Sequence, residues 1–220
     1  KNLGATITGS LNSVESMTGN YYSGIANSIV GIANRTQNSN GALVFGAGNE
    51  ITNSVKSLYN APTDSGNSAK DFADKLRTAI HDDEGGATLA IGGGNKADYT
   101  QASQLIGVNN TLKGSSSSVS QYNALNGYKN TATNVQHVTA IGSENSITNT
   151  NTAVVVGDKR TLTGADNSVI IGSSSNGTTT SVKNAVAIGA ESNATVEGGV
   201  ALGAGSVAST DKGKVGYDPG

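Results

Sequence analysis

The sequence contains no cysteine and no tryptophan among its 220 residues, and it has only two histidines, His81 and His137. The absence of cysteine excludes disulfides, thiol chemistry and every metal site built on thiolates. Two histidines are also too few for a histidine-rich metal cluster. Aromatic residues make up 4% of the chain, so a conventional globular core built around large side chains is not expected.

Strong charge and long apolar runs are missing as well. Charged residues make up 14% of the chain and the formal net charge is −2, which argues against nucleic acid or another polyionic partner. No apolar run reaches the roughly 18 residues of a membrane-spanning helix. Residues 1–4 do not resemble a signal peptide. We therefore expect either a cytosolic protein or an internal piece of a longer chain.

Glycine is abundant, with 30 residues, and much of it belongs to a repeat. Short apolar runs that end in glycine occur at residues 43–46, 89–92, 154–157, 169–172, 186–189 and 200–203. Weaker copies end at Gly9, Gly107, Gly127 and Gly142. From residue 92 to residue 203 these glycines are spaced 14 to 20 residues apart, most often 15. Two registers remain open near the start, because Gly24 and Gly31 are both followed by Ile-Ala-Asn.

An asparagine often follows the repeat glycine by three residues, as at Asn49 and Asn95, and an apolar residue often follows it by five, as at Ile51. Gly and Asn tolerate left-handed backbone conformations and cap turns. Each unit is therefore predicted to be a strand, a corner, a second short strand and a turn. Stacked units of this length predict a parallel β-solenoid with hydrogen bonds between coils. A disordered tract would not need the apolar triplet to return in phase.

Three consecutive apolar residues precede the glycine, so both faces of this strand need cover. We predict that the roll interior is filled by Val154, Val156, Val169 and Ile171. We predict that the outer face carries Ala140, Val155, Ile170, Ala187 and Ala201. A continuous outer apolar stripe is typical of an interaction surface, and closure of identical chains around an axis would bury it. This favours a trimer, or at least an oligomer; the alternative is that single alanines merely tolerate exposure.

Residues 184–194 (Asn-Ala-Val-Ala-Ile-Gly-Ala-Glu-Ser-Asn-Ala) and 199–208 (Gly-Val-Ala-Leu-Gly-Ala-Gly-Ser-Val-Ala) closely resemble the head repeat of trimeric autotransporter adhesins, of the Yersinia-adhesin type. Residues 211–220 also resemble the passage of such a head into its neck or stalk. The resemblance covers nearly the whole chain outside residues 55–86. The pattern departs from the family where Arg160 and Ser175 stand in place of asparagine.

The resemblance implies a single all-β head domain over residues 1–220, a left-handed parallel β-roll that assembles as a homotrimer. Left-handedness rests on the resemblance alone, because crossovers in general are right-handed. The resemblance also implies bacterial attachment to host extracellular-matrix proteins or to other cells, from the cell surface at the tip of an outer-membrane fibre. Membrane contact would be made only through a C-terminal anchor outside this fragment, and a spacer role within the fibre is the alternative.

Residues 55–86 interrupt the repeat and are predicted to form an inserted excursion. Apolar residues at Phe72, Leu76 and Ile80 have the spacing of an amphipathic helix, which we expect over residues 68–80. We expect this apolar face to pack against the roll or a neighbouring chain. The excursion either contacts a ligand, with Phe72, Lys75, Leu76 and Arg77 as the candidate residues, or it buttresses the trimer.

No catalytic set or cofactor site is predicted, because neither His81 nor His137 lies in a motif. The charged run over residues 81–84 is interpreted as a solvated helix end, with no metal bound. Threonines at 52, 133, 148, 163, 178 and 195 each follow a glycine by six residues. Such a column usually stabilises neighbouring strands. The alternative is an ice-binding face, for which Thr148/Thr150 and Thr178/Thr180 would supply the second column.

Overall fold

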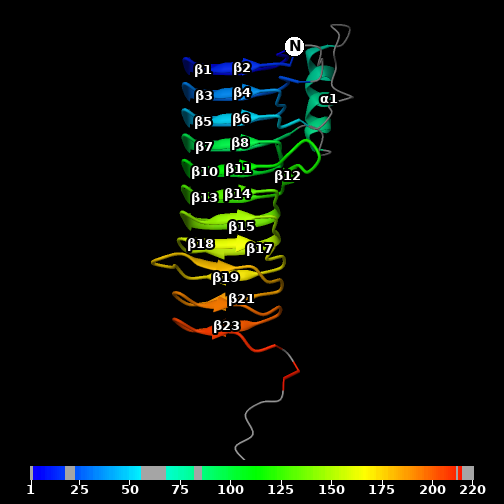
Figure 1. Cartoon of the computed structure of the whole chain (residues 1–220). Coiled ribbons are helices and arrows are strands. Elements are labelled where there is room, and N and C mark those ends of the chain that lie inside the picture. The colour runs from blue at the N-terminus through cyan, green and yellow to red at the C-terminus, as the bar shows by residue number, and fades with distance from the viewer. Residues whose placement is uncertain (1, 18–22, 56–67, 82–85, 212, 215–220) are drawn as a thin grey trace, which may run out of the picture.

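The computed structural model describes residues 2–17, 23–55, 68–81, 86–211 and 213–214. In these residues the chain winds into a stack of coils, with one helix beside the N-terminal end of the stack (Figure 1). Most coils contribute one strand to each of two long sheets, and the strands pair in parallel. The predicted all-β architecture of stacked parallel strands is confirmed.

The longer sheet runs along the whole stack. Its strands follow the order β1 (Thr6–Ser10), β3 (Ser28–Ile32), β5 (Leu43–Ala47), β7 (Leu89–Gly93), β10 (Gln104–Val108), β13 (Ala124–Tyr128), β15 (Gln136–Ser143), β17 (Asn151–Val156), β19 (Val169–Ile171), β21 (Val186–Ile188) and β23 (Val200–Leu202). Two short strands, β9 (Thr100–Gln101) and β12 (Ser120–Gln121), are attached to it. Gly31 pairs with Gly9 and with Gly46. The repeat glycine near the start is therefore Gly31, and two coils precede β5.

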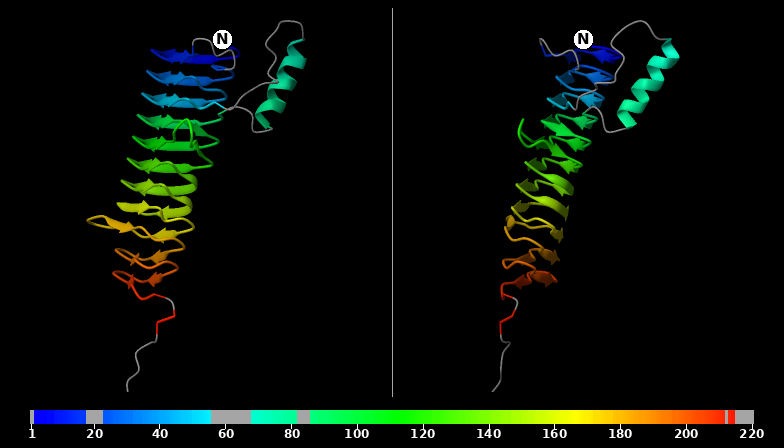
Figure 2. Two further views of the ribbon diagram at one scale, coloured as in Figure 1. Left: turned by 45° about the vertical axis from the view of Figure 1, so that its right-hand side comes forward. Right: turned by 90° about the vertical axis from the view of Figure 1, so that its right-hand side faces the viewer.

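The shorter sheet is formed by the second strand of each coil. Its order is β2 (Ser13–Glu15), β4 (Arg35–Gln37), β6 (Glu50–Thr52), β8 (Lys96–Asp98), β11 (Thr111–Lys113), β14 (Thr131–Thr133), β16 (Ser146–Thr148), β18 (Arg160–Thr163) and β20 (Thr178–Thr180). A separate pair, β22 (Asn193–Ala194) and β24 (Val207–Ala208), occupies the last coils. Figure 2 shows the resulting slender rod from two further sides.

A ladder of asparagines, all buried except the half-buried Asn12 at its start, closes the corner between the two strands of a coil. Asn49 Nδ2 donates to the carbonyl oxygen of Gly92 in the next coil at 2.9 Å. The backbone N–H and Nδ2 of Asn49 both donate to Oδ1 of Asn34 in the preceding coil, each at 3.0 Å. The ladder comprises Asn12, Asn34, Asn49, Asn95, Asn110, Asn130 and Asn145. The predicted Gly-x-x-Asn corner is confirmed, and its buried amides are paired as burial requires.

The interior and exterior of the long sheet are opposite to the prediction. The middle residue of each triplet points inward: Val155 and Ile170 are fully buried, and so are Ala140, Ala187 and, within a few per cent, Ala201. Val154, Val156 and Ile171 are instead 36–39% exposed, and Val169 is half-buried. The reason is that side chains alternate along a strand, and the residue four before the glycine, such as Ala153 or Ala185, is buried as well. The middle residue of the triplet therefore faces the same, inward side.

The excursion contains helix α1 (Ala69–His81), one residue away from its predicted bounds. Ser68 Oγ accepts a hydrogen bond from the N–H of Asp71 at 3.2 Å, which caps the first turn. Ala79 and Leu76 pack with Ile25 in a small apolar cluster at the first coils. Ile80 is 37% exposed. The inward face is therefore centred on Leu76 and Ala79, because Ile80 follows Ala79 by about 100° around the helix.

Parts of two predicted segments lie outside the described residues, namely 56–67 and 82–85 of the excursion and most of residues 211–220. Among the residues that the structure describes, no helix has the length and apolar character needed to cross a membrane.

Candidate functional site

An apolar stripe covers the outer face of the long sheet. It consists of the outward apolar residues Val30, Leu43, Phe45, Leu89, Ile91, Ile106, Ile141, Val154, Val156, Val169, Ile171, Val186, Ile188, Val200 and Leu202. The exposed fraction rises to 56% at Phe45 and 63% at Leu202. Contiguous exposed apolar surface of this kind is unusual on a single soluble chain and typically marks a contact.

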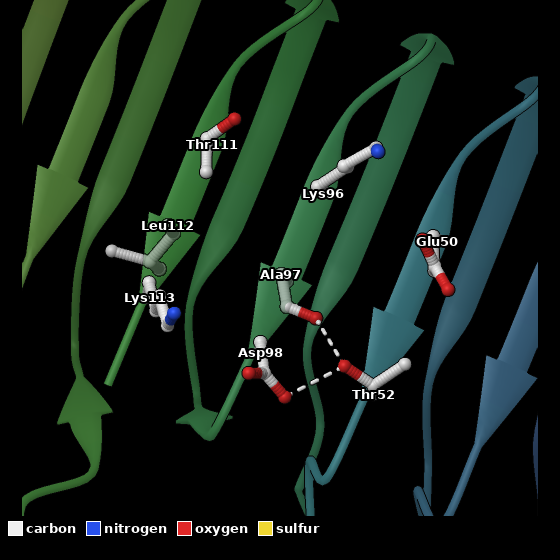
Figure 3. Close-up of a pocket in the computed structure, with 8 residues that line it drawn as sticks. All are labelled: Glu50, Thr52, Lys96, Ala97, Asp98, Thr111, Leu112 and Lys113. Carbon is white, nitrogen blue, oxygen red and sulfur yellow. Dashed lines mark hydrogen bonds between the residues drawn. The ribbon is translucent and has the colours of Figure 1, made fainter. Parts of the chain in front are cut away.

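A shallow groove lies on the outer face of the short sheet (Figure 3). It has a volume of about 260 Å³. Its lining comes from β6, β8 and β11 and comprises Glu50, Thr52, Lys96, Ala97, Asp98, Thr111, Leu112 and Lys113. Asp98 Oδ1 accepts hydrogen bonds from Thr52 Oγ1 at 2.7 Å and from Asn53 Nδ2 at 2.8 Å. The groove thus presents a hydrogen-bonded carboxylate and two exposed lysines on the outer face of the short sheet.

A column of alternating charges borders this groove. The Arg35 guanidinium donates to Glu15 at 2.9 Å and to Glu50 at 2.8 Å, which links β2, β4 and β6. The hydrogen bond from Arg35 lowers the pKa of the Glu15 carboxyl, and the two carboxylates raise the pKa of Arg35. These side chains are about one-third exposed, so solvent screens much of the attraction. The column mainly orients Glu50 at the edge of the groove.

The candidate residues on α1 divide between its two sides. Phe72 and Leu76 are half-buried, whereas Lys75 and Arg77 are exposed. Arg77 donates to Asp74 at 2.6 Å, and Lys70 pairs with the same carboxylate, which lowers the pKa of Asp74. A ligand of the excursion would therefore meet the charged side of α1, because Leu76 packs with Ile25 at the first coils.

Arg160 is a structural residue that sequence reasoning noticed only as a departure from the pattern. It occupies the place of an asparagine in the ladder, and its N–H donates to Asn145 Oδ1 at 3.0 Å. The buried guanidinium donates to the carbonyl oxygens of Gly172 at 2.6 Å, Gly189 at 2.9 Å and Ser192 at 2.6 Å. Burial lowers the pKa of Arg160, and the charge of Glu191 opposes this. The bond to the Gly189 carbonyl oxygen takes the place of the one that an asparagine at position 175 would donate, where this chain has Ser175.

The predicted threonine column is partly correct. Thr133, Thr148 and Thr163 lie in register on β14, β16 and β18. Thr52 shares the column but is separated from them by Asp98 and Lys113. Thr178 instead pairs with Arg160, and Thr195 lies beyond the end of β22.

The second threonine column differs from the predicted one. Thr150 and Thr180 are buried, so they cannot contribute to an outer face. The outward residues beside the first column are instead Thr131, Ser146 and Thr161.

The two histidines do not meet. His81 ends α1, whereas His137 stacks on Tyr122 with 4.8 Å between ring centroids. Within the described parts of the chain, no three His, Cys, Asp or Glu side chains are grouped so as to hold a metal ion. Asp82, Asp83 and Glu84, which belong to the charged run after α1, lie outside those parts.

Comparison of the chain with known protein families, with curated proteins and with solved structures found no match.

Proposed function

We propose that this chain is the binding head of a bacterial cell-surface adhesin, a left-handed β-roll in which three identical chains cover one another's apolar stripe. The observation that carries this proposal is the stripe itself, which follows the long sheet from β3 to β23. A partner for such a surface has to be long, apolar and periodic. Another copy of this chain has the same length and the same spacing between coils, and closed symmetry buries every stripe at once.

The assembly is tested with two variants, each of which places one charge on the outer face of a different sheet. Ile171→Glu puts a carboxylate in the stripe, where burial without a partner is unfavourable. Thr148→Glu puts the same group on the outer face of the short sheet as a matched control. Light scattering should report a trimer for the parent and for Thr148→Glu, and smaller species for Ile171→Glu. A monomeric parent chain would refute the proposed assembly.

The proposed activity is multivalent attachment to extracellular-matrix proteins or to partner cells. Three copies of each groove and each excursion on one rod would raise net attachment through effective concentration, even where a single contact is weak. Binding of the trimer to immobilised collagen, fibronectin, laminin and intact bacterial cells tests this directly. Absence of binding to all of these surfaces would count against an adhesin head.

A spacer role is the structural alternative, and the excursion provides the means to separate the two. Gly86 lies directly against Ser54, since a Cβ on Gly86 would be 1.8 Å from the Ser54 carbonyl oxygen. Deleting residues 55–85 joins these two residues and restores a spacing of 15 between Gly46 and Gly92. If the excursion binds ligand, the deletion keeps the trimer and abolishes attachment. Unchanged attachment by an intact trimer assigns the binding to another surface or a more distal domain.

A second candidate function, ice binding, is supported by the two hydroxyl columns of the short sheet. Thr131/Thr133, Ser146/Thr148 and Thr161/Thr163 face outward on three successive strands. Their spacing is regular, because adjacent strands lie about 4.8 Å apart. Inhibition of ice recrystallisation by the parent protein, lost in Thr148→Glu, would support this candidate.

A further inference from the structure

The apolar stripe has one polar interruption. In the register of the long sheet, Asn126 on β13 lies between Ile106 on β10 and Ile141 on β15. The column that contains it is otherwise apolar from Val30 to Leu202. The neighbouring outward column turns polar on the coils immediately before and after, at Gln104 and Thr139, with Ala124 between them. We call Gln104, Asn126 and Thr139 the polar island.

Asn126 is not satisfied within its own chain. Its Oδ1 is covered from solvent and has no hydrogen-bond partner among the described residues. This contrasts with the asparagines of the corner ladder, whose amides are bonded on both sides. A covered amide oxygen without a partner is unfavourable, so turning the half-buried Asn126 amide outward to a donor on another chain would relieve this cost.

Resting on the proposed assembly, we propose that Asn126 sets the axial register of the associated chains by pairing with Asn126 of its sibling chains. A stripe made only of Ile and Val would fit a copy displaced by one coil almost as well as an aligned copy. Alignment brings the Asn126 side chains to one height, where each amide can turn outward so that Nδ2 of one donates to Oδ1 of the next. Displacement by one coil would set each amide against isoleucine instead.

Register also decides whether the assembly closes. Three chains related by a rotation alone form a closed trimer, whereas a displacement along the axis leaves stripe uncovered at both ends and allows further chains to add. A polar residue that costs some stability but selects one alignment is a known device at helix interfaces. The same reasoning applies to this sheet interface, because its repeat is equally regular.

The register can be read with introduced cysteines, since the chain has none of its own. Ile171 and Ile188 are neighbours in the Asn126 column, on adjacent strands. Chains carrying Ile171→Cys are refolded together with chains carrying Ile188→Cys, and the mixture is oxidised. Disulfides within one variant report aligned chains. Disulfides between the variants report a displacement of one coil, because aligned sulfurs on different coils are poorly placed to bond.

The cysteine experiment is carried out in three forms of the chain. These are the parent with Asn126, the variant Asn126→Ile, and a variant with a relocated amide, in which Asn126→Ile is combined with Ile141→Asn. We expect the ratio of between-variant to within-variant disulfides to rise about tenfold in Asn126→Ile, the effect of one unpaired amide. Light scattering should then show species larger than a trimer. The relocated amide should restore both the low ratio and the trimer, since it provides the same pairing one coil away.

Two outcomes separate the inference from the proposal on which it rests. If the parent chain is monomeric, the assembly itself is wrong. If the parent is a trimer and Asn126→Ile leaves both the disulfide ratio and the particle size unchanged, the assembly stands and the role of Asn126 is refuted.

Discussion

Arg160 Nη2 donates a hydrogen bond of 2.9 Å to the carbonyl oxygen of Gly189, which lies two coils further along the roll. Through this bond and its bonds to Gly172 and Ser192, one side chain connects three coils. Elsewhere in the ladder an asparagine connects only to the coils immediately before and after it. Arg160 therefore bonds the corner carbonyls of two successive coils, those of Gly172 and Gly189.

Arg160→Ala should destabilise the roll strongly. It removes the donors to three carbonyl oxygens, and we expect a loss of about 2–5 kcal/mol in the free energy of unfolding. Chemical denaturation followed by circular dichroism measures this loss. Lys113→Ala removes an exposed cation instead and should change the free energy by less than about 0.5 kcal/mol. Equal effects of the two substitutions would mean that the arginine bonds contribute nothing.

Gly107→Ala should disrupt the corner of its coil. Gly107 has a φ of +122°, and an added Cβ would lie 2.1 Å from the carbonyl oxygen of Gly127. We expect a cost of about 3 kcal/mol or more, because backbone has to move. Gly164→Ala is the control, since Gly164 also has a positive φ, +62°, but has open space around it. That substitution should cost only about 1–2 kcal/mol, the conformational penalty alone.

Asn110→Ala should interrupt the asparagine ladder. Asn110 Nδ2 donates to Asn95 at 3.0 Å and to the Gly127 carbonyl oxygen at 2.9 Å, and its Oδ1 accepts from Asn130. Removal leaves several buried groups unpaired, and we expect a loss of about 2–4 kcal/mol. The adjacent Asn109 is exposed with a positive φ, so Asn109→Gly should be nearly neutral. Thermal melting of both variants against the parent distinguishes them.

Glu191 should make the C-terminal coils sensitive to acid. The backbone N–H of Ser175 and the hydroxyls of Ser174, Ser175 and Thr178 donate to its carboxylate, and they lower its pKa to about 2 from 4.5. A lowered folded-state pKa means that this stabilisation is present above pH 4.5 and is lost as the pH falls toward 2. The melting temperature of the parent should drop across this window.

Glu191→Gln tests the assignment because its amide does not titrate. It should be less stable than the parent at neutral pH and should lose less stability on acidification. Glu144→Gln, at an exposed position, should follow the pH profile of the parent. Parallel profiles for the parent and Glu191→Gln would contradict the role of this carboxylate.

The coil itself was predictable, whereas the side of the long-sheet strands that faces the interior was predicted wrongly. Repeat glycines and their asparagines locate every corner from β7 to β15 because turn chemistry is local. The inward residue was misassigned because three apolar residues in a row give no alternation to read. The structure resolves this through the residue four before the glycine, because Ala153 and Ala185 are buried on the same side as the middle residue of the triplet. The helix was predicted from the spacing of its apolar residues. Its orientation about its own axis, which buries Ala79 and leaves Ile80 exposed, was not predicted.

By itself, the sequence determined that the chain forms stacked coils of about 15 residues with one helical excursion, because these features depend on residues close together along the chain. Only the tertiary structure decided which apolar residues form the stripe, how Arg160 replaces two asparagines and which hydroxyls share a face. The physical reason is that each of these depends on contact with a neighbouring coil. Such contacts join residues 12 to 46 positions apart, at separations that vary with every insertion between coils.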